Sequence, residues 1–203
     1  MNIDIIVFDG HDDLDVFGPS EVLRMAELMR ADLHASRVTR TPQDAVTSQF
    51  QTHYSPDGVY QPGRAEMIIV PGGGWGRKAE HGTWGEVQRG DWLPLLRDAA
   101  QRGAIMVSVC AGAMLLAHAG VIGARRAGTH HSAWDDLSAT GATLVRDRVV
   151  DDGDLITCGG VTSGIDLALW LVEKYASAAL AEAVAGNLEY RNRARPVPAG
   201  AGV

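Results

Sequence analysis

The sequence has few cysteines and no long apolar run, and each shortage excludes a class of protein. Two cysteines among 203 residues are too few for a disulfide scaffold, so a reducing compartment is expected. No apolar stretch approaches the roughly 20 residues that span a bilayer. The first residues also lack the basic region and cleavage site of a signal peptide. We therefore expect a cytoplasmic protein with no membrane partner.

Positive charge is scarce as well. The chain has 18 Lys and Arg against 25 Asp and Glu, a net charge of −7. Binding to a phosphate backbone needs clustered Lys and Arg, so no nucleic-acid partner is expected. No group of His and Cys residues has the spacing of metal ligands. We expect neither a metal nor another cofactor.

What the chain does contain is an alternation of short apolar strands and amphipathic helices, which is typical of a parallel α/β sheet. The expected strands are 3–8, 34–39, 67–70, 104–109 and 155–157, with one or two peripheral strands in 46–60, and the expected helices are 19–30, 92–101, 111–119, 162–175 and 178–191. Pro19 suits the first turn of its helix. This length fits one domain, residues 1–195, followed by a disordered tail at 196–203.

The strongest signal for chemistry is the junction at Cys110, where an apolar strand runs directly into a helix of small and apolar residues. Ala111 and Gly112 permit the sharp turn of a nucleophile elbow, which lifts a side chain above the sheet edge. A helix N-terminus favours the thiolate, and open parallel sheets bind ligands at the carboxyl ends of their strands. Cys110 is therefore a candidate nucleophile, and a buried core cysteine is the alternative.

Two further segments follow strands and are expected at the same edge of the sheet. The backbone amides of 72–74 could point at a developing negative charge, as oxyanion-hole donors do. In the acidic loop after the first strand, Asp15 lies between Leu14 and Val16 and is the residue expected to face inward. A protonated carboxyl beside a thiolate can donate and later accept a proton. The alternative is a solvated loop with Asp12 and Asp13 outside.

Taken together, five motifs in this order resemble the DJ-1/PfpI superfamily and, within it, the isocyanide hydratase-like branch. The motifs are LDVFGP at 14–19, VPGGG at 70–74, SVCAGA at 108–113, AGTHHSAW at 127–134 and GGVTSGIDLAL at 159–169. The resemblance implies a flavodoxin-like three-layer sandwich with a mainly parallel sheet and a nucleophile elbow. It also implies a homodimer that acts on a small electrophilic molecule without a cofactor.

The resemblance assigns roles to single residues. Cys110 is the implied nucleophile, Asp15 stands at the acidic position beside it, and His130 falls at the histidine position, although the adjacent His131 leaves that choice open. The implied oxyanion and substrate-binding residues are Gly72, Gly73, Ala111, Thr129 and Val161, the last of them in a loop over 159–163 that would pack beside the thiol.

The chain departs from the isocyanide hydratase pattern in two places. Ala111 stands where these enzymes have threonine, which removes a hydroxyl beside the nucleophile. The segment over 75–92 is longer and carries Trp75, Trp84 and Trp92. These rings could line a hydrophobic pocket, form a dimer contact or pack in the core. Both departures leave the substrate open.

Three functions remain from the sequence: an isocyanide hydratase-like enzyme, a glyoxalase or deglycase acting on 2-oxoaldehydes, and a redox or ligand sensor in which Cys110 oxidises. The aspartate at position 15 favours the hydratase over the glutamate-bearing DJ-1 branch, whereas Ala111 counts against it. Cys158 is a small core residue or, alternatively, a resolving cysteine.

Other readings find little support in the sequence. A glutamine amidotransferase needs a downstream His-x-Glu, which is missing after Cys110. The glycine pattern at 74–79 follows an internal strand and places Trp75 where a pyrophosphate would lie, so a dinucleotide site is not expected. No helix-turn-helix module follows the α/β region, which argues against direct DNA binding.

Overall fold

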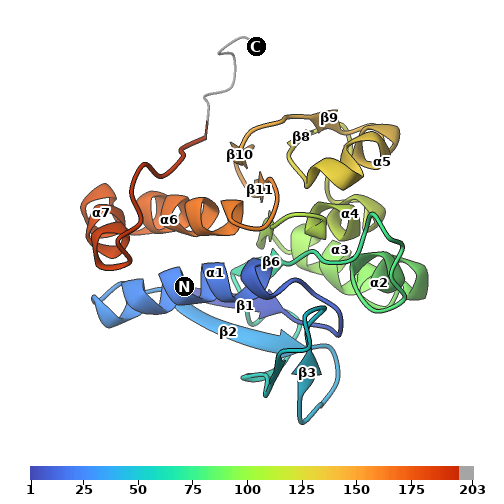
Figure 1. Cartoon of the computed structure of the whole chain (residues 1–203), viewed down its shortest axis with the longest axis horizontal. Coiled ribbons are helices and arrows are strands. Elements are labelled where there is room, and N and C mark those ends of the chain that lie inside the picture. The colour runs from blue at the N-terminus through green and yellow to red at the C-terminus, as the bar shows by residue number, and fades with distance from the viewer. Residues whose placement is uncertain (197–203) are drawn as a thin grey trace.

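The computed structural model describes residues 1–196 and has a seven-stranded, mainly parallel sheet at its centre (Figure 1). The strand order is β10-β11-β7-β6-β1-β2-β5, in which β10 alone runs antiparallel to its neighbour. The strands are β1 (Asn2–Ile6), β2 (His34–Thr39), β5 (Gly58–Val59), β6 (Met67–Val70), β7 (Ile105–Ser108), β10 (Val149–Asp151) and β11 (Leu155–Cys158). All residues of β6 and β11 are buried, as expected for strands covered on both faces.

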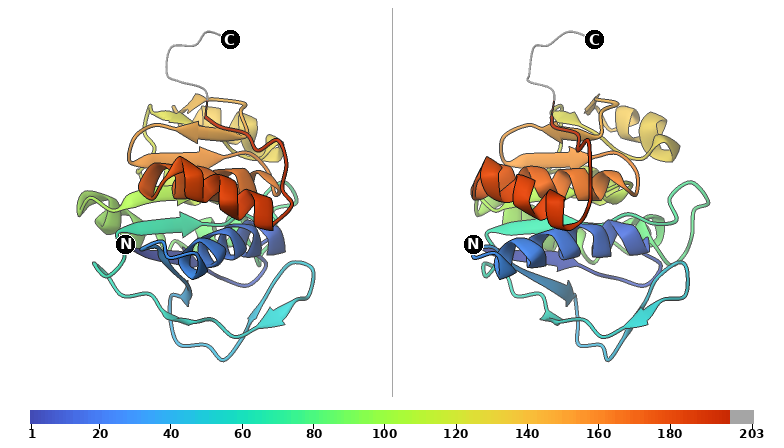
Figure 2. Two further views of the ribbon diagram at one scale, coloured as in Figure 1. Left: turned by 90° about the vertical axis from the view of Figure 1, so that its left-hand side faces the viewer. Right: turned by 60° about the vertical axis from the view of Figure 1, so that its left-hand side comes forward.

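Helices cover both faces of this sheet. On one face lie α1 (Asp13–Leu28), α6 (Ser163–Tyr175) and α7 (Ala178–Asn187), and on the other lie α2 (Thr83–Arg89), α3 (Leu93–Gln101) and α4 (Gly112–His118). Figure 2, seen from the side of α6 and α7, shows the strands running behind these helices. The expected α/β sandwich of three layers is confirmed. The smaller elements are β3 (Val46–Thr47), β4 (His53–Tyr54), β8 (Arg126–Ala127), a 3₁₀ turn η1 (His131–Ala133), α5 (Trp134–Ala139) and β9 (Thr143–Leu144).

The first helix differs most from expectation, because it begins at Asp13 rather than Pro19. Asp12 caps it by accepting a hydrogen bond from the Leu14 N–H at 3.1 Å, which satisfies one of the free amides of the first turn. Pro19 lies inside the helix, where it cannot donate to the carbonyl of Asp15. The acidic segment is therefore helical and not a loop, and this places Asp15 against the sheet.

Two other segments also differ from the expected elements. Residues 46–60 hold three short strands, of which β5 joins the edge of the main sheet. The segment over 75–92 contains α2, which was not predicted, between Gly82 and a left-handed Gly90. Glycine stands at both ends of this helix. The segment also has little of the apolar periodicity that reveals a helix in a sequence. Of the tail expected at 196–203, residues 197–203 lie outside the described residues.

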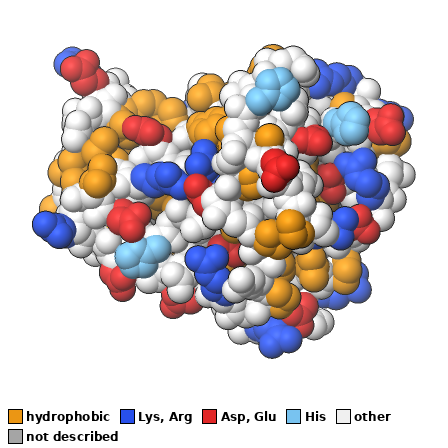
Figure 3. Space-filling view, turned by 90° about the horizontal axis from the view of Figure 1, so that it is seen from below, with side chains coloured by type: hydrophobic (Ala, Val, Ile, Leu, Met, Phe, Trp, Pro, Cys, Tyr) orange, Lys and Arg blue, Asp and Glu red, His pale blue; other side chains and the backbone are white. Residues whose placement is uncertain are grey.

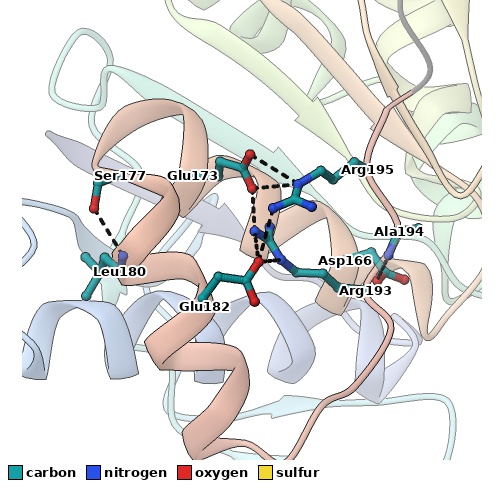
Figure 4. A network of polar contacts seen from close by, with 8 residues as sticks. All are labelled: Asp166, Glu173, Ser177, Leu180, Glu182, Arg193, Ala194 and Arg195. Carbon is teal, nitrogen blue, oxygen red and sulfur yellow. Dashed lines mark hydrogen bonds and ion pairs between the residues drawn. The ribbon is translucent and has the colours of Figure 1, made fainter.

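The C-terminal segment after α7 returns across α6 and is held there by ion pairs. Figure 4 shows two arginines of this segment bound to two glutamates of α6 and α7: Arg193, Arg195, Glu173 and Glu182. The N–H of Ala194 donates to buried Asp166 at 2.7 Å. Asp166 also accepts from Arg148 at 2.6 Å, and Arg148 donates to Thr162 at 3.2 Å. The C-terminal segment is thereby connected to the loop over 159–163.

The surface seen in Figure 3 carries hydrophobic side chains in separate groups among charged ones. The exposed large hydrophobic residues of the described chain are Leu14, Leu28 and Phe50. Single exposed hydrophobic residues are common on monomers, so the homodimer stays a prediction. Within residues 1–196 no helix has the length and apolar character needed to cross a bilayer.

Candidate active site

Cys110 lies in the sharp turn between β7 and α4, as the sequence predicts. Its φ of +57° is uncommon for a residue with a side chain and signals a constrained turn. Neighbouring strands hold that turn, because the Cys110 N–H donates to the carbonyl of Gly159 at 3.0 Å. At Gly112, a Cβ would lie 2.1 Å from the carbonyl oxygen of Val70, so only glycine allows α4 to begin this close to β6.

Asp15 lies in the first turn of α1, fully buried, with its carboxyl beside Cys110. The Gly72 N–H donates to its Oδ2 at 2.9 Å. A Cβ on Gly72 would lie 2.9 Å from this oxygen and 3.0 Å from the Cβ of Cys110, so Gly72 is fitted between the acid and the thiol. Burial and then the nearby charge of Asp12 raise the pKa of Asp15 well above its ordinary value, against the opposing effect of the Gly72 N–H and Cys110.

The thiol and the carboxyl form a coupled pair. Burial and the charge of Asp15 raise the pKa of Cys110, whereas the backbone N–H groups of Val161 and Ala111 donate toward the sulfur and lower it. Two negative charges this close in a buried site are costly, so the pair retains one proton. A protonated Asp15 beside a thiolate is one of its two forms, and it is the form that could attack an electrophile and then deliver a proton.

The glycine segment contributes to both the acid and the cavity. The Gly72 amide donates to Asp15, which leaves its predicted oxyanion role as a prediction. Gly73 lines the cavity at the thiol together with Ala111 and Val161. This cavity has a volume of about 290 Å³. Its lining consists of Asp12, Gln49, Gly73, Gly74, Trp75, Gly76, Arg77, Cys110, Ala111, His130, Ser132 and Val161, and we call it the thiol pocket.

Of the two adjacent histidines, His130 is the one that lines the thiol pocket. It precedes the 3₁₀ turn η1 rather than ending a strand, and its Nδ1 lies 2.9 Å from the Ser132 hydroxyl. Its ring packs against the backbone of Gly160. Burial and then the neighbouring His131 lower the pKa of His130, so it is neutral at pH 7. His131 is exposed and lines an adjoining hollow.

Thr129 lies behind the turn and does not face the pocket. Its hydroxyl donates to the carbonyl of Cys110 at 2.9 Å and is buried. We therefore expect Thr129 to position the nucleophile's backbone. It also lines the hollow that adjoins the thiol pocket, and the substrate-binding role stays a prediction.

Replacing Thr129 with valine is expected to slow alkylation of Cys110 by iodoacetamide about five- to tenfold, because the turn loses one of its buried hydrogen bonds. The free energy of unfolding should fall by about 1 kcal/mol. Thr143→Val is the matched control, since the Thr143 hydroxyl donates to the carbonyl of Ala124 at 3.0 Å on the exposed side of β9. Equal slowing in both variants would remove the positioning role.

Three residues of the thiol pocket escaped sequence reasoning. Asp12 was placed outside only in the alternative of a solvated loop; it is buried as the cap of α1 and also accepts a hydrogen bond from the Gln49 side chain. Gln49 in turn accepts from Arg77 at 2.9 Å. The cap position of Asp12 could have been read from the acidic first turn. Gln49 and Arg77 come from distant loops and carry no motif.

The three tryptophans of 75–92 have separate environments. Trp75 lines the thiol pocket and donates from its ring nitrogen to Asp136 at 2.7 Å. Trp84 is half-buried in an adjoining hollow, and Trp92 is buried in the core with its ring edge toward Tyr60. One apolar ring, not three, therefore faces the thiol.

Cys158 ends β11, is completely buried and is a free thiol like Cys110. Burial and then the charge of Asp15 raise its pKa well above the ordinary value, which disfavours the thiolate that a resolving cysteine needs. Within residues 1–196 no group of three or more His, Cys, Asp or Glu side chains is placed to hold a metal ion.

Comparison with known proteins gives consistent results. The model of the "DJ-1/PfpI family" matches residues 1–174. An isonitrile hydratase of Pseudomonas putida is 33% identical over 191 residues, which cover 94% of this chain and 78% of that protein. The glutathione-independent glyoxalase DJR-1.2 of Caenorhabditis elegans is 33% identical over 110 residues, or 53% of this chain and 54% of that one.

Solved structures resemble the chain closely in fold. A ThiJ/PfpI family protein from Pseudomonas syringae superposes with a TM-score of 0.83 at 27% identity, covering 98% of this chain and 78% of that one. Drosophila melanogaster DJ-1beta superposes with a TM-score of 0.80 at 21% identity, covering 94% and 98%.

Proposed function

Since the chain belongs to the DJ-1/PfpI family, we propose that it is a cysteine-dependent enzyme that hydrates isonitriles to N-formamides. The observation that carries this proposal is the buried carboxyl of Asp15 against the Cys110 thiol. The similarity to an isonitrile hydratase over 94% of the chain supports it. Such a reaction needs one nucleophile and one group that gives and takes protons at the same carbon, and it needs no redox step.

In the proposed first step, the Cys110 thiolate attacks the terminal carbon of the isonitrile and forms an S–C bond. The Asp15 carboxyl gives its proton to that carbon, which yields a thioimidate and leaves Asp15 ionised. The proton moves over a short path, because the Asp15 carboxyl lies within hydrogen-bonding reach of the Cys110 thiol.

In the second step, water adds to the carbon of the thioimidate, and Asp15, now a carboxylate, accepts one proton from the water. The remaining hydroxyl proton of the tetrahedral adduct is transferred to the nitrogen as the C=O bond forms and the C–S bond breaks. The Cys110 thiolate leaves, the N-formamide is released, and the starting pair of thiolate and protonated Asp15 is restored. The amides of Ala111 and Val161, which donate toward the sulfur, stabilise the thiolate as it leaves. The absence of a hydroxyl at position 111 leaves these donors unchanged, because both are backbone groups.

A second candidate is glyoxalase chemistry, in which the same thiol adds to a 2-oxoaldehyde as a hemithioacetal. The similarity of 110 residues to a glutathione-independent glyoxalase supports it. Asp15 would then move a proton between the two carbons of the adduct. Trp75 beside the thiol offers an apolar surface that a small oxoaldehyde does not need, which favours the isonitrile.

The test is formation of N-formamide from cyclohexyl isocyanide, followed by mass spectrometry, with methylglyoxal as the competing substrate. We expect formamide to accumulate catalytically and methylglyoxal to be consumed at least tenfold more slowly. Consumption of methylglyoxal alone would replace the proposal by glyoxalase activity. Turnover of neither, with rapid oxidation of Cys110 by peroxide, would favour a sensor.

A further inference from the structure

Within the described part of the chain, two charged side chains line the thiol pocket, Asp12 and Arg77. Only the charge of Asp12 is stabilised by groups of the protein. Asp12 accepts hydrogen bonds from the Leu14 N–H at the start of α1 and from the Gln49 side chain. A helix N-terminus stabilises a carboxylate. The negative charge of Asp12 is thus stabilised by the N-terminus of α1 and by Gln49.

Arg77 has no such balance. Its Nη2 donates to the Gln49 Oε1 at 2.9 Å, a neutral acceptor, and among residues 1–196 it pairs with no carboxylate. His130, which also lines the pocket, is neutral at pH 7, because burial and His131 lower its pKa. Arg77 is therefore the cation of the pocket, with part of its guanidinium free for a ligand.

Cys110 and Arg77 line one cavity of about 290 Å³, which limits a ligand to a small molecule. Such a ligand can place its reactive carbon at the thiol and another group at Arg77. A guanidinium binds a carboxylate through two parallel hydrogen bonds. The chain as a whole has a net charge of −7 and repels anions at long range, so a local cation is what an anionic substrate would require.

We propose that the substrate is an isonitrile that carries a carboxylate a few atoms from the isocyano group, and that Arg77 determines this preference by binding the carboxylate. The inference rests on the proposed hydration of isonitriles. It adds a specificity-determining residue that acts on binding and takes no part in the chemistry at the carbon.

The first test compares kcat/KM for isocyanoacetate and for its neutral methyl ester. The wild type should prefer the anion, and Arg77→Gln should lower the ratio of the two values about 10- to 100-fold, mostly through KM. Arg77→Lys should keep part of the preference. Lys78→Gln removes an equal charge from the adjacent residue, which does not line the thiol pocket, and should change the ratio less than twofold.

The second test needs no hydration activity. Cys110 is alkylated with iodoacetate, an anion, and with iodoacetamide, its neutral counterpart, and the ratio of the two rates is measured. Arg77→Gln should lower this ratio at least fivefold, and Lys78→Gln should not. An unchanged ratio in Arg77→Gln overturns the role of Arg77. A lowered alkylation ratio with no hydration of either isonitrile keeps the anion site and rejects isonitriles as its substrates.

Discussion

Replacing Cys110 with serine is expected to lower kcat/KM for isonitrile hydration more than about 10⁴-fold, because a serine hydroxyl in this buried site lacks a base strong enough to ionise it. The residue's position makes the variant easy to interpret. A φ of +57° is unchanged by exchange of sulfur for oxygen, and the turn keeps its hydrogen bonds to Gly159 and Thr129. N-formamide production by the two proteins at equal concentration is the measurement.

Cys158→Ser is the matched control for this experiment. It changes the second thiol of the chain, which is also buried, and should leave kcat/KM within about threefold. Activity above one hundredth of wild type in Cys110→Ser would show that the nucleophile lies elsewhere. A large loss in Cys158→Ser with an unaltered fold would instead favour a role for both thiols.

Asp15→Asn is expected to lower kcat about 10²- to 10³-fold, since the amide has the shape of the acid and can accept from the Gly72 N–H but has no proton to give. KM should change little, because the proposed mechanism places Asp15 at the reacting carbon and not at the rest of the substrate. Stopped-flow or discontinuous formamide assays give both constants. Asp13→Asn, in the same first turn of α1, is the control and should retain activity. An Asp15→Asn enzyme with wild-type kcat would exclude Asp15 as the proton donor.

Asp15→Asn is also expected to raise the stability of the protein at alkaline pH, although it lowers activity. The pKa of Asp15 is raised in the folded protein relative to an unfolded value of about 3.9. Such a carboxyl contributes its full stability below about pH 4, and stability is lost as the pH rises from there to the folded pKa. Asp15→Asn should therefore be more stable than the wild type at pH 8 and similar to it at pH 4. Urea unfolding in a Cys110→Ser background, which removes the coupled thiol, measures this difference. A difference that shrinks as pH rises would contradict the raised pKa.

The sequence predicts well wherever one short segment contains the whole signal. The apolar run before Cys110 and the small residues after it are sufficient to indicate a strand, a sharp turn and a helix. The strands β2 and β6 were predicted with the bounds that the structure has. Hydrophobic periodicity is a local property, and so are the steric demands of a turn.

The predicted helices were wrong in two segments, where the local signal was weak or misleading. Helix α2 has glycine at both ends and little periodicity, and the start of α1 was misplaced because Pro19 suits a first turn better than a helix interior. Packing against the sheet outweighs that preference, and Asp12 becomes the buried cap of the helix. Once α1 starts at Asp13, Asp15 must face the thiol.

By itself the sequence determined the α/β fold and the nucleophile elbow at Cys110, and it suggested Asp15 as its partner. Only the tertiary structure decided that the Gly72 amide donates to Asp15 and that His130 rather than His131 lines the thiol pocket. It also decided that Arg77 lines this pocket and donates to Gln49. The physical reason is sequence separation. Gln49 follows β3 of the small two-stranded sheet and Arg77 lies in the loop after β6, yet both line one pocket with Cys110. No local preference in the sequence records which distant loop residues will meet at the ends of the parallel strands.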